Sequence, residues 1–349
     1  MPIHPPGPAK RRARPLAALG IAAQLLLAAP PHALAQTTAQ TTAQTTAQPS
    51  ACDRACLSGL LDAYLAALKA HDPRSLPLAA GVRFTENGVP LAVGDGLWNT
   101  IDGIGDYRLP FIDPEDGQAG LFGVVQEDGK WAHFLLRLKV EGGKIAEIET
   151  IVLRPAENMG FGRPEAMKRR PIFYEDVPED QRLTKVQLDA MANAYFDTLQ
   201  QNNGAVFAPF AADCNRIESG VQTTNNSAPS PTGRPDPAGI KQLGCEAQFK
   251  TGFFRFVTFI RDRRFLIADR QKGLIYAAAF FDHKGDMRKV KLTDGRITDA
   301  QYDTPWTWQI GELFKVKDGK IQQIEALVMH APYGMPDVWS GHPAWRPAH

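Results

Sequence analysis

The chain has 349 residues, 44% of them hydrophobic and 22% charged, which is typical of a globular protein of about two domains. Its formal net charge is +1. This balance gives no bulk electrostatic attraction to nucleic acid or to an anionic membrane, so neither partner is expected.

Residues 1–35 read as an export signal rather than as part of the fold. A basic region with Arg11 and Arg12 precedes a short apolar run, Leu16 to Ala29, and Ala33-Leu34-Ala35 supplies a cleavage site. The arginine pair leaves both the general secretory and the twin-arginine routes open. We therefore expect a periplasmic or secreted protein with no membrane span after cleavage. Residues 36–50 repeat TTAQ and are expected to be a disordered spacer.

The chain has four cysteines, Cys52, Cys56, Cys214 and Cys245. An even number in an exported chain indicates disulfides, and four cysteines allow three pairings. Pairing Cys52 with Cys56 and Cys214 with Cys245 is preferred, because each bond then stays within one repeat. The histidines are scattered, so no metal site is expected. The sequence has no P-loop, dinucleotide fingerprint, H-E-x-x-H or G-x-S-x-G motif, which favours a function without a cofactor.

The chain after the spacer repeats one pattern of elements. Residues 51–156 open with leucines and Tyr64 at helical spacing, break at His71-Asp72-Pro73, and continue into a strand that closes at Asn87-Gly88. Residues 185–332 repeat this opening and carry extra segments after Gly220 and after Gly285. Residues 157–184 are expected to be a linker, and residues 333–349 a C-terminal tail.

Further stretches of the two copies can be overlaid. Ile104 to Gly117 lies over Ile260 to Gly273 without a gap, and Gly143 to Glu149 lies over Gly319 to Glu325. Each copy is thus a helix, a short helical turn, and a series of strands joined by hairpin turns. Glu149 and Glu325 recur at equivalent places, which indicates structural salt bridges, with Arg108 and Arg264 as the expected partners.

These patterns resemble the nuclear transport factor 2-like (SnoaL-like) superfamily. The resemblance is carried by the opening up to the TENG strand end and by the closing LLRLKVEGGKIAEIETIV. The second copy, with RDRRFLIAD, FFDH and HAPYGMPDVW, also resembles an uncharacterised domain of exported bacterial and fungal proteins. The implied fold is α+β, with two tandem cone-like domains, each a curved antiparallel sheet wrapped round helices. Related single domains dimerise through their sheets, which implies an intramolecular pseudo-dimer here.

Two glutamates at equivalent strand ends are candidate general bases. Glu86 shares strand parity with Val82 and Phe84, so it is expected to face the inside of the first cone. The resemblance to ketosteroid isomerases implies that Glu86, and Glu218 in the second copy, act as bases whose pKa an apolar pocket raises. The alternative is that each glutamate only caps the turn after it.

Glu312 is a further catalytic candidate, because it falls where the first copy has Leu136. An acid at an inward and otherwise apolar position costs free energy unless it is paired or used. Arg216, in line with Phe84 of the first copy, is the expected partner. The alternatives are a purely structural pair of Arg216 and Glu312, or a bulge that turns Glu312 outward.

Other candidates are less specific. His283 follows Asp282 at a strand end and can carry protons near neutral pH, although its place before a hairpin turn also fits a structural residue. Trp98, Tyr107 and Trp308 are expected to line a pocket, or else to pack in the core or an interface.

These observations favour an exported small-molecule pocket protein that binds a small hydrophobic or aromatic ligand. The leading function is a cofactor-independent lyase or isomerase that uses carboxylate acid/base chemistry. The alternatives are a binding protein without turnover, and a structural or interaction module whose cones are filled by side chains.

Overall fold

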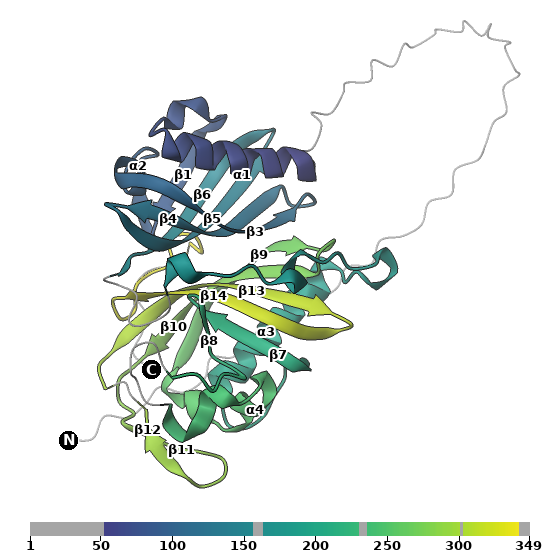
Figure 1. Ribbon diagram of the computed structural model, residues 1–349, viewed down its shortest axis with the longest axis vertical. Helices are drawn as coiled ribbons and strands as arrows, with labels where there is room; N and C mark the ends of the chain where they lie inside the picture. The colour runs from purple at the N-terminus through teal and green to yellow at the C-terminus, as the bar shows by residue number, and fades with distance from the viewer. Residues whose placement is uncertain (1–51, 156–162, 230–235, 301–302, 342–349) are drawn as a thin grey trace, which may run out of the picture. The chain divides into compact units, whose positions relative to one another are not determined.

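The computed structural model describes residues 52–155, 163–229, 236–300 and 303–341. The expected export signal and TTAQ spacer lie outside these ranges. The described chain has an α+β fold with two six-stranded sheets, each packed against a long helix (Figure 1). None of the helices within those ranges is long and apolar enough to cross a membrane.

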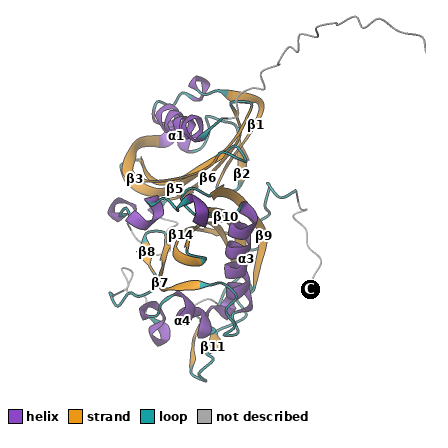
Figure 2. Cartoon of the chain, turned by 90° about the vertical axis from the view of Figure 1, so that its right-hand side faces the viewer, coloured by secondary structure: helices purple, strands orange, loops and turns teal. Residues whose placement is uncertain are grey.

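The first cone begins with a helix whose first residue and buried face can both be predicted from its sequence. Asp53 caps α1 by accepting a hydrogen bond from the Cys56 N–H, and the leucines and Tyr64 at helical spacing are buried. Figure 2 shows the first sheet curving round α1. The elements of this cone are α1 (Arg54–Lys69), η1 (Pro73–Ser75), β1 (Leu78–Glu86), β2 (Val89–Leu91), α2 (Leu97–Thr100), β3 (Ile101–Asp113), β4 (Gln118–Glu127), β5 (Lys130–Glu141) and β6 (Lys144–Leu153).

The second cone repeats this plan with additional pieces. Its long helix α3 begins with a capping box between Thr184 and Gln187 and ends at Asn202, which has a φ of 34°. The connection from the first cone contains η3 (Pro164–Ala166), η4 (Pro171–Tyr174) and η5 (Glu179–Gln181). The elements of the second cone are α3 (Lys185–Gln201), β7 (Phe210–Glu218), β8 (Val221–Gln222), η6 (Pro237–Gln242), α4 (Cys245–Lys250), η7 (Phe253–Phe256), β9 (Phe259–Asp269), β10 (Leu274–His283), β11 (Lys289–Lys291), β12 (Ile297–Asp299), β13 (Trp306–Lys317) and β14 (Lys320–Ala331).

The strand order is β2-β1-β6-β5-β4-β3 in the first sheet and β8-β7-β14-β13-β10-β9 in the second. The expectation of antiparallel sheets is wrong at one pair in each cone, since β1 runs parallel to β6 and β7 runs parallel to β14. The reason is the chain path. β1 and β2 lie at one edge of the first sheet, and the chain then crosses to the opposite edge, where β3 begins. It returns through β4 and β5, so that β6 arrives beside β1 running in the same direction. The remaining pairs are antiparallel.

Both disulfides have the pairing preferred from the sequence. Cys52 is bonded to Cys56 at the start of α1, and Cys214 in β7 is bonded to Cys245 at the start of α4. The second bond ties the segment inserted after Gly220 to the sheet of its own cone.

Three apolar clusters organise the described chain. One fills the inside of the first cone and one the inside of the second. The third joins the outer faces of the two sheets, with Phe111 stacked on Tyr276 at a ring distance of 5.1 Å. Its buried members are Tyr107, Leu109, Phe111, Phe122, Val124, Leu135, Ile151, Leu153, Phe173, Ile267, Leu274, Tyr276, Ala278, Leu313, Leu327, Met329 and Ala331.

Two equivalent aspartates exchange hydrogen bonds between the cones. Asp113 accepts from the backbone N–H of Ala268 at 3.1 Å, and Asp269 accepts from the backbone N–H of Ile112 at 3.0 Å. Each carboxylate also accepts an N–H from its own turn. The two contacts are therefore equivalent when the copies are exchanged, as the overlay of the copies would require.

One of the expected salt bridges is present, between Glu149 and Arg264, whereas Glu325 and Arg108 have other partners. The gap-free overlay of the copies breaks down in the second sheet. The ladder between β9 and β10 shifts register between Tyr276 and Ala277, which places Arg264 opposite Ala278, where the first cone has Leu109 opposite Phe122. Arg264 consequently reaches across to Glu149 of the other sheet, at 2.6 and 3.1 Å. Arg108 instead pairs with Asp62.

Candidate functional site

A row of four side chains crosses the inner face of the second sheet. Glu218 of β7 lies beside Ala326, which lies beside Glu312 of β13, which lies beside Ala277 of β10. Ala326 and Ala277 belong to the apolar cluster inside this cone, so the two glutamates face inward. Glu312 thus has a small alanine on either side.

The equivalent row of the first cone has leucine in place of Glu312 and larger side chains in place of the two alanines. It runs from Glu86 through Thr150 and Leu136 to Leu121. The position of Glu312 is taken by Leu136, and both of the flanking positions carry larger side chains than alanine. The difference between the cones is therefore concentrated around Glu312.

Glu312 is 3% exposed, and its burial raises the pKa of the carboxyl to about 8 against the opposing effect of Arg216. The Tyr195 hydroxyl of α3 lies within hydrogen-bonding reach of this carboxyl and of the Arg216 guanidinium. The Oε2 atom of Glu312 has no hydrogen-bond partner among the described residues. At neutral pH this group is mainly a neutral acid, able to donate a hydrogen bond or a proton.

Arg216 is buried beside Glu312 and held by several neighbours. Its Nη1 donates to the Oε1 of Gln248 at 2.9 Å, and its Nη2 is paired with Glu218. The guanidinium carbon lies 5.0 Å from the ring centre of Phe249 and 5.3 Å from that of Phe254, a cation–π arrangement. Its Nε atom contacts no acceptor within the described ranges. The charge is therefore fixed in place, with one donor left over.

Gln248 and Phe249 come from α4, in the segment that the first cone lacks. The Gln248 Nε2 also donates to the backbone carbonyl of Ile240 at 2.9 Å, and Phe249 stacks on Phe210 of β7 at 5.6 Å. The Cys214–Cys245 disulfide joins this segment to β7 two residues before Arg216. The insertion thus closes one side of the polar cluster.

In the first cone, Glu86 contacts residues of its own cone. It accepts the Leu97 N–H at 2.8 Å, and it pairs with Arg154 at 3.0 Å. Trp98 is buried against Tyr64 in an edge-on contact at 5.3 Å. Neither residue is brought near the cluster of Glu312, and the Glu86 carboxylate contacts the start of α2 and Arg154 rather than the turn that follows it.

His283 lies at the far end of β10 in an aromatic group. It stacks on Trp306 at 3.7 Å and meets Trp308 edge-on at 5.0 Å. Burial lowers the pKa of its imidazole to about 3, so the ring is neutral at physiological pH. Trp308 is half-buried and packs against the apolar cluster inside the same cone.

Tyr107 lies outside both cone interiors, in the apolar cluster between the sheets. Its hydroxyl donates to Glu325 at 2.5 Å, and burial raises the pKa of Glu325 to about 7. Of the two alternatives that the sequence left for Tyr107, the structure shows packing at an interface rather than in a cone interior, since parity alone does not tell the inner face of the sheet from the outer one.

Two members of the cluster were missed by sequence reasoning. Tyr195 repeats Tyr64 of the first copy, so its position alone indicates a structural residue, and Gln248 lies in a segment without a counterpart. Strand parity could have indicated neither, because both come from helices. Within the described ranges no group of three or more His, Cys, Asp or Glu side chains could hold a metal ion.

Comparisons with solved structures give low similarities. The chain is similar to a protein described as a polyketide cyclase from Xanthomonas campestris pv. campestris, at 14% identity over 41% of this chain and 90% of the other, with a TM-score of 0.26. It is similar to a protein with a ketosteroid isomerase-like fold from Catenulispora acidiphila DSM 44928, solved in complex with trimethylamine, at 16% identity over 45% and 97%, with a TM-score of 0.23. It is also similar to a de novo designed protein with a curved β-sheet, at 17% identity over 30% and 89%, with a TM-score of 0.25.

No curated protein matches the sequence significantly. A family model does match, over residues 50–152 and 181–328, which together make up most of the chain. These ranges take in both sheets and the cluster of Glu312. The protein therefore belongs to the family described as Domain of unknown function (DUF8021).

Proposed function

We propose that this is an exported, cofactor-independent protein whose second cone binds a small apolar or aromatic molecule and exchanges a proton with it through Glu312. The observation that carries the proposal is the state of Glu312, which is buried, neutral at physiological pH, and left with an unpartnered oxygen among the described residues. Buried acids with raised pKa values are the usual agents of proton transfer in apolar sites. The reaction class that fits is an isomerisation or a lyase reaction.

The residues around Glu312 fit a ligand with a carbonyl oxygen. The remaining donor of Arg216, its Nε, would hold that oxygen, while the ionised fraction of Glu312 takes the proton from the neighbouring carbon and later returns it. A fixed cation with an unused donor suits an oxygen on which negative charge develops as that proton leaves. Glu218 is already paired with Arg216, so we assign it to fixing that charge rather than to moving a proton.

Several broader features belong to the same proposal. Residues 1–35 direct export to the periplasm or the medium, which suits the two disulfides. Residues 51–156 and 185–332 act as two cone domains, joined through their outer faces into an intramolecular pseudo-dimer. The apolar cluster between the sheets and the reciprocal contacts of Asp113 and Asp269 support this arrangement. The first cone, filled around Leu136, then serves as the partner of the active one.

A second candidate function is a purely structural cone. It is favoured by the number of bonds that Arg216 already makes, since Gln248 and Glu218 take both terminal nitrogens. In that case the polar cluster would stabilise the inserted segment, and no ligand would enter.

The test is hydrogen–deuterium exchange into small aromatic and aliphatic carbonyl compounds, followed by NMR in D2O, because it detects proton transfer whatever the product. We expect exchange at carbon next to the carbonyl in the wild type and its loss in Glu312→Gln. Glu86→Gln, the equivalent change in the first cone, is the matched control and should leave exchange unaltered.

Saturation-transfer difference NMR on the same compounds separates the candidates. Binding without exchange in the wild type would show a binding protein, and neither binding nor exchange would favour the structural cone. Exchange that survives in Glu312→Gln would remove Glu312 from the proposal.

A further inference from the structure

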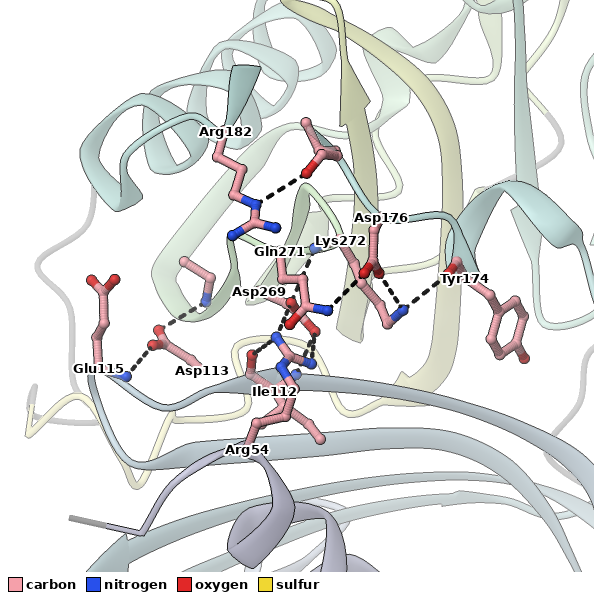
Figure 3. A network of polar contacts seen from close by, with 12 residues as sticks. Arg54, Ile112, Asp113, Glu115, Tyr174, Asp176, Arg182, Asp269, Gln271 and Lys272 are labelled. Carbon is pink, nitrogen blue, oxygen red and sulfur yellow. Dashed lines mark hydrogen bonds and ion pairs between the residues drawn. The ribbon is translucent and has the colours of Figure 1, made fainter. Parts of the chain in front are cut away.

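A second site lies away from the cluster of Glu312, in a groove where the turns of the two sheets meet (Figure 3). Its volume is about 300 Å3, at the lower end of the range for small-molecule sites. Three arginines and three acids line it, together with a similar share of apolar surface. The lining residues are Arg54, Asp113, Pro114, Glu115, Glu179, Arg182, Ala268, Arg270 and Gln271.

Some of these charges are already balanced by ion pairs. Arg54 holds the buried Asp269 with both terminal nitrogens and also donates to the carbonyl of Ile112 at 3.2 Å. Arg270 pairs with Glu115 and donates through Nε to the carbonyl of Leu183 at 3.0 Å. Within these two ion pairs the opposite charges cancel.

Three lining charges have no ion pair among the described residues: Asp113, whose carboxylate accepts only backbone N–H groups, and the oppositely charged Arg182 and Glu179. Arg182 uses its Nε for the carbonyl of Val177 at 3.0 Å, and its two terminal nitrogens donate to no described residue. Glu179, three positions earlier, has no ion pair in the described part of the chain and is exposed. Gln271, which also lines the groove, gives its amide N–H to Asp176 at 2.7 Å, which leaves its carbonyl oxygen available as an acceptor.

We propose that this groove binds a small zwitterion, of the chemical class of a free amino acid. A carboxylate accepts two parallel hydrogen bonds from the terminal nitrogens of Arg182, the geometry that a guanidinium prefers. The ammonium group lies towards Glu179 and the carbonyl oxygen of Gln271. A ligand with one charge only would meet a like charge across the groove, so the site selects for both charges together. This site does not depend on the function assigned to Glu312.

The test is calorimetric titration of the full chain with the standard amino acids, one at a time, and with acetate and methylammonium as single-charge probes. We expect at least one amino acid to bind saturably, and each single-charge probe to bind at least about tenfold more weakly, because a charged hydrogen-bond pair is lost. Arg182→Gln and Glu179→Gln should each lower amino-acid affinity by about tenfold or more. Both side chains are at the surface, so both variants are expected to fold, which thermal melts would check.

The matched control is Arg163→Gln, an exposed arginine of the same connection that does not line the groove. It should bind like the wild type. The proposal is overturned if no amino acid binds saturably, if acetate binds as tightly as the best amino acid, or if Arg182→Gln leaves that affinity unchanged.

Discussion

At the residue scale, the two cones differ most at one position of the inner row. Leu136 contributes buried apolar surface to the first cone, whereas Glu312 places an ionisable group in the same surroundings of the second. Folding therefore has to overcome the loss of hydration of a carboxyl, and the protein does so by keeping it protonated.

This arrangement predicts a pH dependence of stability. The unfolded chain releases the Glu312 proton above pH about 4.5, while the folded chain keeps it up to about 8. The folded state thus binds more protons in this window, so stability should fall as the pH rises, by up to about 1.4 kcal/mol per pH unit, and level off above the window. Glu312→Gln should remove this part of the slope in urea unfolding.

The matched variant is Glu325→Gln. Because burial raises the pKa of Glu325 only to about 7, this change should alter the slope below neutral pH and leave the slope above it in place. If Glu312→Gln unfolds with the same pH profile as the wild type, the carboxyl is ionised in the folded protein, and its assignment as a neutral acid is wrong.

At the scale of elements, α4 is held to the sheet from two sides. The Cys214–Cys245 disulfide fixes its start, and Gln248 and Phe249 contact Arg216 and Phe210 within the cone. The helix has only six residues, so tertiary contacts rather than intrinsic propensity must hold it in place.

Removing this bond should be costly. A disulfide that closes a loop with a sequence separation of 31 is worth about 4 kcal/mol in the chain-entropy model, whereas one with a separation of 4 is worth about 2 kcal/mol. We expect the double change Cys214→Ser, Cys245→Ser to lower the free energy of unfolding about twice as much as Cys52→Ser, Cys56→Ser. Urea titrations of the two variants measure the difference, and equal losses would contradict it.

At the scale of the whole molecule, much of the apolar surface of each sheet's outer face is covered by the other sheet. The second sheet contributes Ile267, Leu274, Tyr276, Leu313 and Leu327 to the shared cluster, all of them nearly inaccessible to solvent. Alone, that face would be a large exposed apolar patch of the kind that drives association.

Residues 185–341 expressed without the first cone should therefore not remain a soluble monomer. We expect a dimer that pairs its outer face with itself, or aggregation, in light scattering after size exclusion. A folded monomer with a normal cooperative melt would show that the cones do not need one another.

Sequence alone was able to predict the elements and the inward direction of several side chains. The spacing of leucines located α1, the Asn87-Gly88 pair located a turn with two positive φ values, and strand parity put Glu218 and Glu312 on the inner face. These are local periodicities of 3.6 and 2, which do not depend on partners far along the chain.

The contacts that depend on distant partners were not predictable. A single register shift beside Ala277 brings the Arg264 side chain into contact with Glu149 of the other cone. An overlay of sequences cannot detect such a shift. Tyr107 faces the other sheet for the same kind of reason, since parity separates two faces but does not say which of them a second domain covers.

The exchange of hydrogen bonds between Asp113 and Asp269 has a consequence for how the two halves can vary. The end of each strand, β3 and β9, donates a backbone N–H to a carboxylate of the opposite half, so replacing either aspartate leaves a buried N–H of the other half without an acceptor. Asp113 and Asp269 therefore cannot be replaced without affecting the half to which they do not belong. The side chains of the inner rows contact only their own half. Leu136 and Glu312, which occupy equivalent positions there, can therefore differ without affecting the other half.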